Sequence, residues 1–267
     1  MAQGSGSNPR EIDFSVPHSA RIWNYWLGGK DHFTADQEAG DAFLSVYPLQ
    51  RDKARACRLF LYRTVRSLAL ERGVRQFLDI GTGLPTANNT HEVAQDAVPE
   101  SRIVYVDNDP LVLAHARALL TGAPQGATDY IDADLQDPDT ILAGAANTLD
   151  FDEPIALLLI GVLGHVQDDE EARSIVRRLL DRLPSGSYLV QCDGTDSSPE
   201  YLAAIAQYAD SGAVPYNART AEQIAGFYDG LELVDPGVGP ITLWGAEPNP
   251  FGGPLDVAEV GGVGRKV

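Results

Sequence analysis

Short apolar runs alternate with stretches of helical composition from Gln76 to about Ala209. This alternation is typical of βαβ units, in which helices cover both faces of a parallel sheet. One run, residues 155–160, is apolar throughout and predicts a strand that is buried on both faces. The other expected strands are 76–80, 102–107, 128–131 and 187–192, with a final pair at 232–234 and 241–244. We therefore expect an α/β protein with a mostly parallel, seven-stranded sheet.

The rest of the chain divides around this pattern. Residues 1–11 are rich in Gly, Ser and Asn and are predicted to be disordered. Residues 12–70 have helical composition without a strand pattern and are predicted to form an N-terminal helical cap. Residues 71–267 then form the main α/β domain, with the Gly-rich tail GGVGRKV expected to fray. The helices expected in this domain are 87–97, 111–120, 138–149, 168–183 and 199–209, and Thr220 with Gln223 predicts a further capping box.

Composition narrows the possible partners. The 267 residues include 38 acidic and 20 basic side chains, a formal charge of −18, which argues against nucleic acid and anionic membranes. The basic run between Arg51 and Arg66 is typical of a solvated helix face. Cys57 and Cys192 are far apart and form neither a disulfide framework nor a metal-ligand spacing, so no metal is expected. No signal peptide or membrane-length apolar run is present, which favours the cytoplasm.

Acidic residues and glycines follow the first three expected strands. The first strand leads into Asp79-Ile80-Gly81-Thr82-Gly83, the second ends at Asp107, and the third is followed by Asp132-Ala133-Asp134-Leu135. In parallel sheets, ligands bind beyond the carboxyl ends of the strands. A glycine turn lets a ligand approach the backbone, and a carboxylate at Asp107 suits two ribose hydroxyls. The structural alternatives are an ordinary βα turn, a helix N-cap and a solvated acidic turn.

The details of the glycine turn favour one adenosine ligand over another. A dinucleotide-binding turn has the pattern G-x-G-x-x-G, but here the third position is Thr86, preceded by Pro85. Asp79 lies two residues before the first glycine, where its carboxylate would repel a pyrophosphate and attract the ammonium of a methionine moiety. The charges therefore favour S-adenosylmethionine over NAD.

At this point the motifs resemble known proteins. FLDIGTG, YVDNDP and DADL resemble the first three motifs of class I S-adenosylmethionine-dependent methyltransferases. More narrowly, PHSARIWNYWLGGKDHFTAD and FLDIGTGLPTANNTHEVAQ resemble an actinobacterial family of S-adenosyl methyltransferases, long catalogued as a domain of unknown function. The resemblance extends from about Ile12 to Trp244 and implies a Rossmann-like class I fold with S-adenosylmethionine as the cofactor. The chain departs from the general class I pattern at Pro85, where a third glycine is common.

Carried over residue by residue, the resemblance implies a cofactor site but no acceptor. Asp79, Gly81 and Gly83 would line the methionine end of the cofactor, and Asp107 would bind the ribose. Asn108, Asp134 and Leu135 would surround the adenine, while Gly161 and Leu163 would pass beneath the ligand.

The aromatic segment 17–36 suggests a further contact with the cofactor. Gly28-Gly29 is predicted to end a helix there, and the hypothesis is that the segment covers the cofactor, with Asn24, Tyr25 and Lys30 reaching the site. The alternative is simple packing of this helix on the sheet, with Trp23 and Trp26 in the core.

Methyl transfer mainly requires alignment of the acceptor and exclusion of water, and a base is needed only if the acceptor loses a proton. The candidate bases are His165, Tyr25 and His32, although His165 could instead only hold its loop by a hydrogen bond. The most fitting activity is methylation of a small molecule. The alternatives are an NAD(P)-dependent oxidoreductase and a non-catalytic S-adenosylmethionine-binding protein. A homo-oligomer is compatible with the sequence, which does not set the oligomeric state.

Overall fold

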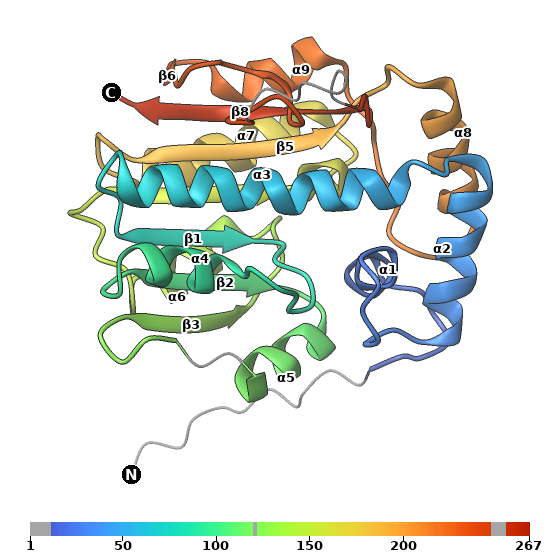
Figure 1. The fold of residues 1–267 in the computed structure, drawn as a ribbon, viewed down its shortest axis with the longest axis horizontal. Helices are drawn as coiled ribbons and strands as arrows, with labels where there is room; N and C mark the ends of the chain where they lie inside the picture. The colour runs from blue at the N-terminus through green and yellow to red at the C-terminus, as the bar shows by residue number, and fades with distance from the viewer. Residues whose placement is uncertain (1–11, 120–121, 247–254) are drawn as a thin grey trace.

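The computed structural model describes residues 12–119, 122–246 and 255–267 (Figure 1). The predicted disorder of residues 1–11 lies outside this described part of the chain. The strands are β1 (Gln76–Ile80), β2 (Arg102–Asp107), β3 (Ala127–Asp132), β4 (Ile155–Ile160), β5 (Tyr188–Gly194), β6 (Leu231–Leu233), β7 (Gly239–Pro240) and β8 (Glu259–Lys266). The α-helices are α1 (Ser19–Trp26), α2 (Thr34–Val46), α3 (Gln50–Leu70), α4 (Thr90–Ala97), α5 (Pro110–Leu119), α6 (Pro138–Ala145), α7 (Asp169–Asp181), α8 (Pro199–Ala209) and α9 (Ala221–Ala225), and the short 3₁₀ helices are η1 (Leu163–His165) and η2 (Gly226–Tyr228).

One sheet organises the molecule. Its strands follow the order β3-β2-β1-β4-β5-β8-β6, with the two-residue β7 paired to β8. The pairs among β1 to β5 are parallel, and β8 runs antiparallel to both β5 and β6. The order reverses between β1 and β4, which is where an open parallel sheet forms its ligand crevice. The mostly parallel, Rossmann-like sheet expected from the sequence is confirmed.

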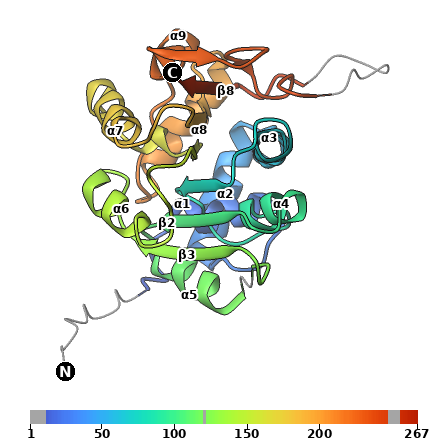
Figure 2. The ribbon, with the colours of Figure 1, turned by 90° about the vertical axis from the view of Figure 1, so that its left-hand side faces the viewer.

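Helices cover both faces of this sheet. Viewed along the sheet in Figure 2, α3 and α4 lie on one face and α6 and α7 on the other. β4 supplies buried side chains to both cores: Ile155, Leu157 and Leu159 to the α7 side, and Ala156 and Leu158 to the α3 side. Burial on both faces explains why this strand has no polar position in its interior.

Three helices lie beyond the carboxyl ends of the parallel strands. Figure 1 shows α1, α2 and α8 on the side to which the arrows of β1 and β5 point. Their shared core is aromatic, with Trp26, Phe43, Tyr201 and Tyr208 buried together. The third helix of the N-terminal segment, α3, does not join this layer. It packs on one face of the sheet and buries Phe60 and neighbouring side chains there. The N-terminal helices thus supply both a covering layer and a helix of the main sandwich.

The C-terminal tail is the main error in the sequence-based prediction of the fold. The tail GGVGRKV, residues 261–267, was expected to fray, but β8 extends from Glu259 to Lys266 and lies between β5 and β6. Residues 241–244, expected to be a strand, form a turn. Glycine disfavours strands, but here it lets the backbones approach closely. A Cβ on Gly261 would lie 2.3 Å from the carbonyl oxygen of Gln191, and one on Gly264 would lie 2.9 Å from the Tyr228 ring.

The basic run on α3 is a second correction. Arg51, Arg55 and Arg66 are exposed, as a solvated face requires, but Lys53 is buried and Arg63 is half-buried. Arg63 donates to the carbonyl oxygens of Ile241 and Trp244, and so fixes the turn before β8. None of the helices in the described ranges is long and apolar enough to cross a membrane.

Candidate functional site

A cleft of about 220 Å³ opens at the carboxyl ends of β1, β2 and β4, where the strand order reverses. It brings together nine of the residues singled out in the sequence: Asp79, Gly81, Gly83, Asp107, Asn108, Asp134, Leu135, Gly161 and His165. They come from the tips of neighbouring strands, so the expected shared hollow exists. The opposite wall comes from α1 and α3, with His18, Trp23 and Arg58 among its residues.

The floor of the cleft is formed by glycines whose backbone conformation would be strained in any residue with a side chain. Gly81, Gly83 and Gly161 have φ angles of 74°, 66° and 68°, in the left-handed region. Gly81 donates its N–H to the Val106 carbonyl at 2.8 Å, and Gly161 donates to the Cys192 carbonyl at 2.8 Å. These turns place bare backbone against the cleft at the ends of β1 and β4.

Asp107 is the most constrained carboxylate of the cleft. Its Oδ2 accepts from the Gly83 N–H at 2.9 Å, and its Oδ1 accepts from the Asp109 N–H at 2.9 Å. The side chain therefore links the end of β2 to the glycine turn after β1. Burial raises its pKa, while the two backbone hydrogen bonds oppose that rise. Each carboxylate oxygen keeps a second lone pair for a ligand hydroxyl.

Asp79 lies deeper, beside a cation that the sequence did not reveal. The Thr90 hydroxyl donates to its Oδ2 at 2.6 Å. Burial raises the pKa of Asp79 to about 6, although Thr90 and Arg58 both lower it. Arg58 reaches the cleft from α3 and donates to the carbonyl oxygens of Ala87 and Asn88, at 3.3 and 2.7 Å. One end of the cleft thus presents a carboxylate and a guanidinium side by side.

The other end of the cleft is formed by the residues after β2 and β3. The Asn108 amide donates to Asp134 Oδ2 at 2.8 Å, and Asp134 Oδ1 accepts the Gln136 N–H at 2.9 Å. Leu135 is buried beside them. An apolar wall next to a linked amide and carboxylate suits a flat heterocycle with polar edges.

Four of the predicted ligand contacts do not line the cleft. Asn24 accepts the Asp31 N–H at 3.0 Å and closes the turn after α1. The Tyr25 hydroxyl donates to Asp41 on α2, and Lys30 is exposed. Leu163 is fully buried in the core on the α7 side. Helical periodicity explains the first two, because the face of α1 that carries His18, Ser19 and Trp23 is the one that meets the cleft. His32, the remaining candidate base, does not line the cleft either.

His165 does reach the cleft, in a defined tautomer. Its Nδ1 lies 3.2 Å from the Pro215 carbonyl oxygen, which only accepts hydrogen bonds, so Nδ1 carries the proton. Burial lowers the pKa of His165, which keeps the ring neutral near pH 7. In this tautomer Nε2 carries the lone pair of the ring. The loop-holding hydrogen bond expected as an alternative is present at Nδ1.

An ion pair that the sequence did not predict joins the covering helices to the sheet. Arg21 on α1 donates from Nε and Nη2 to the two oxygens of Asp109, at 2.9 and 3.1 Å. Both side chains are buried, and Asp109 also lies 3.3 Å from His18 Nδ1. Since Asp109 donates its own N–H to Asp107, α1 is linked through two residues to the glycine turn. The only sequence signal for this role was the position of Asp109 after β2.

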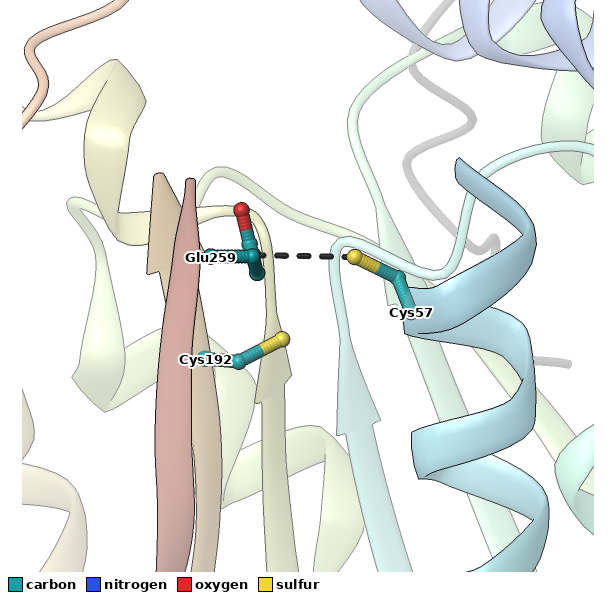
Figure 3. A group of neighbouring side chains, drawn as sticks. All are labelled: Cys57, Cys192 and Glu259. Atoms are coloured by element: carbon teal, nitrogen blue, oxygen red, sulfur yellow. Dashed lines mark hydrogen bonds between the residues drawn. The ribbon is translucent and has the colours of Figure 1, made fainter. Parts of the chain in front are cut away.

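The two cysteines, distant in sequence, meet beneath the cleft. Figure 3 shows Cys57 from α3 and Cys192 from β5 pointing into the same space beside Glu259, with Cys57 Sγ 3.6 Å from Glu259 Oε1. Their donor atoms lie within 4.8 Å of one another. However, Lys53 Nζ lies 2.9 Å from Glu259 Oε2 and supplies the positive charge there. Burial raises the pKa of Cys192, and the Glu259 carboxylate raises it further, which favours a protonated thiol over the thiolate that a metal requires.

The sheet order, the glycine turn after β1 and the cleft beyond the strand tips define a class I methyltransferase fold. A solved O-methyltransferase family protein from Burkholderia thailandensis shares this fold, with 14% identity and a TM-score of 0.52 over 91% of this chain and 63% of its own. Residues 5–267 match the family described as S-adenosyl methyltransferase, and the chain belongs to that family.

Two solved structures are similar over nearly the whole chain. A DUF574 family protein from Streptomyces avermitilis MA-4680 is 44% identical, with a TM-score of 0.92 over 96% of this chain and 100% of its own. A protein from Thermobifida fusca YX, described as a proposed methyltransferase, is 38% identical, with a TM-score of 0.87 over 95% of this chain and 96% of its own. No curated protein matches the chain. The resemblance to the actinobacterial family is confirmed.

Proposed function

We propose that this protein transfers a methyl group from S-adenosylmethionine to a small-molecule acceptor. The observation that carries the proposal is the convergence of Asp79, Asp107 and Asp134, from the tips of three neighbouring strands, on one glycine-floored cleft. Family membership supports the same cofactor. When bound, S-adenosylmethionine supplies a methyl group activated on a sulfonium centre. The protein therefore needs to bind the reactants, align them and exclude water from them.

The residues of the cleft fit the parts of this cofactor. Asp79 and Arg58 offer a carboxylate for its ammonium and a guanidinium for its carboxylate. Asp107 offers its oxygens to the ribose hydroxyls, and Leu135, Asn108 and Asp134 offer a wall and polar edges to the adenine. The Cβ-free turns at Gly81, Gly83 and Gly161 leave room for the ligand against the backbone.

The NAD(P) alternative fits less well. A dinucleotide site places its pyrophosphate at a helix N-terminus directly after the glycine turn. Here α4 begins only at Thr90, with Asn89 and Glu92 forming its capping box. Arg58 binds the intervening carbonyl oxygens, and the buried Asp79 stands where the phosphate charge would fall.

His165 is the acceptor-side base in this proposal, for acceptors that must lose a proton. Its neutral ring offers Nε2 at the cleft, next to Gly161. A turnover rate that is unchanged in His165→Gln would remove this role.

A ligand panel tests the cofactor. Saturation at 100 times the dissociation constant adds about 2.7 kcal/mol to the unfolding free energy, which corresponds to roughly 5–10 °C in Tm for a chain of this size. We expect that shift with S-adenosylmethionine and S-adenosylhomocysteine and not with NAD or NADP. A shift with NAD alone would overturn the proposal. If the protein binds S-adenosylmethionine but converts none of it to S-adenosylhomocysteine in the presence of any acceptor, the non-catalytic alternative is favoured instead.

The acidity of Asp79 predicts a pH dependence of binding. Its folded pKa is raised to about 6, so the carboxyl is protonated below that pH and cannot pair with an ammonium. We expect S-adenosylhomocysteine affinity to rise about fivefold between pH 5 and pH 6, to reach about tenfold by pH 7 and to level off above it, because the ionised fraction of the carboxyl rises from about one tenth to one half to nine tenths. Asp79→Asn should bind weakly at all these pH values. Calorimetric titration checks this, and a wild-type affinity that is flat from pH 5 to 7 would contradict the ammonium contact.

We also propose that the protein acts in the cytoplasm. Cys57 and Cys192 are free although they lie together, which fits a reducing compartment. A thiol count on protein isolated without reductant checks this, with two free thiols expected.

A further inference from the structure

A smaller cavity, of about 50 Å³, adjoins the cofactor cleft beneath the covering helices. Ser19, Trp23, Gly161 and His165 line both spaces, so the two share a wall at the end of β4. We call the smaller cavity the inner chamber. A molecule in it would reach the cofactor cleft past Gly161 and the candidate base His165.

The walls of the inner chamber are mainly aromatic. Side chains from α1, α2, α8 and the loop after α8 contribute Trp26, Phe43, Tyr201, Ile205, Tyr208 and Tyr216. Trp26, Phe43, Tyr201 and Tyr208 are each at most 7% exposed, so the covering helices close this side of the chamber. Aromatic walls favour a flat ring, which packs on them by stacking or edge contacts.

The polar lining of the inner chamber carries no net charge. Lys53 Nζ lies 2.9 Å from Glu259 Oε2, 3.0 Å from the Ala258 carbonyl oxygen and 3.4 Å from the centre of the Tyr201 ring. Both charged side chains are at most 3% exposed. The ammonium is already balanced by the carboxylate, so a charged ligand would enter this buried space without a counter-ion.

The side-chain oxygen of Gln50, which lines the chamber, lacks a hydrogen-bond partner in the part of the chain that the structure describes. Gln50 is 2% exposed, and its side-chain Oε1 accepts no hydrogen bond from the described residues. A buried acceptor without a donor is destabilising, and structures rarely keep one unless another group completes it. The missing partner is a donor, such as a hydroxyl or an amine N–H.

From these four features we propose that the inner chamber binds the methyl acceptor, and that the acceptor is a neutral, single-ring molecule with a hydroxyl or N–H donor directed at Gln50. This inference rests on the proposed methyltransferase function. The size limit follows from the volume of the chamber, because a cavity that binds benzene has about 150 Å³ and the chamber has about 50 Å³. Even a single ring must therefore extend past the shared wall into the cleft or displace side chains of the chamber. The atom that receives the methyl group would lie at that wall, beside Gly161 and His165.

Probe binding tests the chamber without knowledge of the natural acceptor. Phenol and toluene differ by one hydroxyl, and their affinities for protein saturated with S-adenosylhomocysteine can be measured by ligand-observed NMR titration. In Gln50→Leu, the ratio of phenol affinity to toluene affinity should fall about fivefold or more, the worth of one hydrogen bond. Benzoate and benzylammonium should bind the wild type at least about tenfold more weakly than phenol.

A filling variant locates the probes. Ile205→Trp places a larger side chain in the chamber, and should weaken phenol and toluene at least about tenfold while S-adenosylhomocysteine affinity stays unchanged, because Ile205 lines only the chamber. Leu202→Trp, the same change on the exposed face of α8, is the matched control and should alter neither.

The outcomes separate the two proposals. If the wild type fails to bind S-adenosylhomocysteine, the proposed function itself is wrong. If it binds that ligand but neither neutral probe, or if Ile205→Trp binds both probes like the wild type, the chamber is not the acceptor site. An unchanged phenol-to-toluene ratio in Gln50→Leu removes the donor requirement, and tighter binding of a charged probe than of phenol removes the neutral acceptor. The Gln50 measurement stands alone if Ile205→Trp does not fold.

Discussion

Asp107→Ala is expected to weaken S-adenosylhomocysteine binding at least about 100-fold. In the proposed complex the carboxylate accepts both ribose hydroxyls, and a hydrogen bond to a charged group contributes about 1.5–3 kcal/mol. Two such bonds correspond to about 3–6 kcal/mol. The variant also leaves the N–H groups of Gly83 and Asp109 without their acceptor, so the glycine turn loses its link to β2. Calorimetric titration of the purified variant measures the effect.

The control for this prediction is Asp132→Ala. Asp132 pairs in register with Asp107 at the tip of the neighbouring strand but does not line the cleft. It should keep wild-type affinity, which separates a specific contact from the general acidity of this edge. Far-ultraviolet circular dichroism establishes that both variants are folded. Wild-type affinity in folded Asp107→Ala would remove the ribose contact from the proposed function.

The strand tips could be predicted from sequence because their signals are local. An apolar run followed by an acid and glycines, as in β1 and the turn after it, specifies a strand, a turn and a ligand-facing edge within eight residues. The parallel order then brings Asp79, Asp107 and Asp134 to one place without any further information. Thr220 with Gln223 is a second local signal, and the capping box of α9 is confirmed.

Contacts between distant segments could not be predicted in this way. Cys57 and Glu259 are 202 positions apart, and only the docking of β8 beside β5 brings them together. The sequence did not predict β8 because glycine-rich segments have low intrinsic strand propensity. Glycine is needed at position 261 because the backbone there approaches Gln191 too closely for a side chain, and this contact is visible only in the folded structure. Arg58 was assigned to a solvated face because periodicity separates the faces of a helix but does not reveal which face meets a cleft.

Gly81→Ala is expected to lower the unfolding free energy by about 2–5 kcal/mol. Its φ of 74° lies in the left-handed region, which costs a residue with a Cβ about 1–2 kcal/mol. In addition, the new Cβ would lie 2.4 Å from Val162 Cγ2, and relieving such an overlap typically costs about 1–3 kcal/mol. Urea unfolding of the protein without ligand measures the sum.

Gly83→Ala separates these two contributions. Gly83 has a similar φ of 66°, but a Cβ there would meet nothing within 4 Å, so only the backbone strain of about 1–2 kcal/mol should remain. Combining Gly81→Ala with Val162→Ala removes the Cγ2 overlap but leaves Val162 Cβ 2.8 Å from the new Cβ, so the double change should destabilise the protein by at least about 0.5 kcal/mol less than the sum of the single changes. Equal losses at Gly81 and Gly83, together with additive effects at Gly81 and Val162, would show that the segment after β4 does not press on the glycine turn. That contact joins the two strand ends between which the cofactor cleft opens, so its coupling energy also measures how firmly the floor of the cleft is held before any ligand arrives.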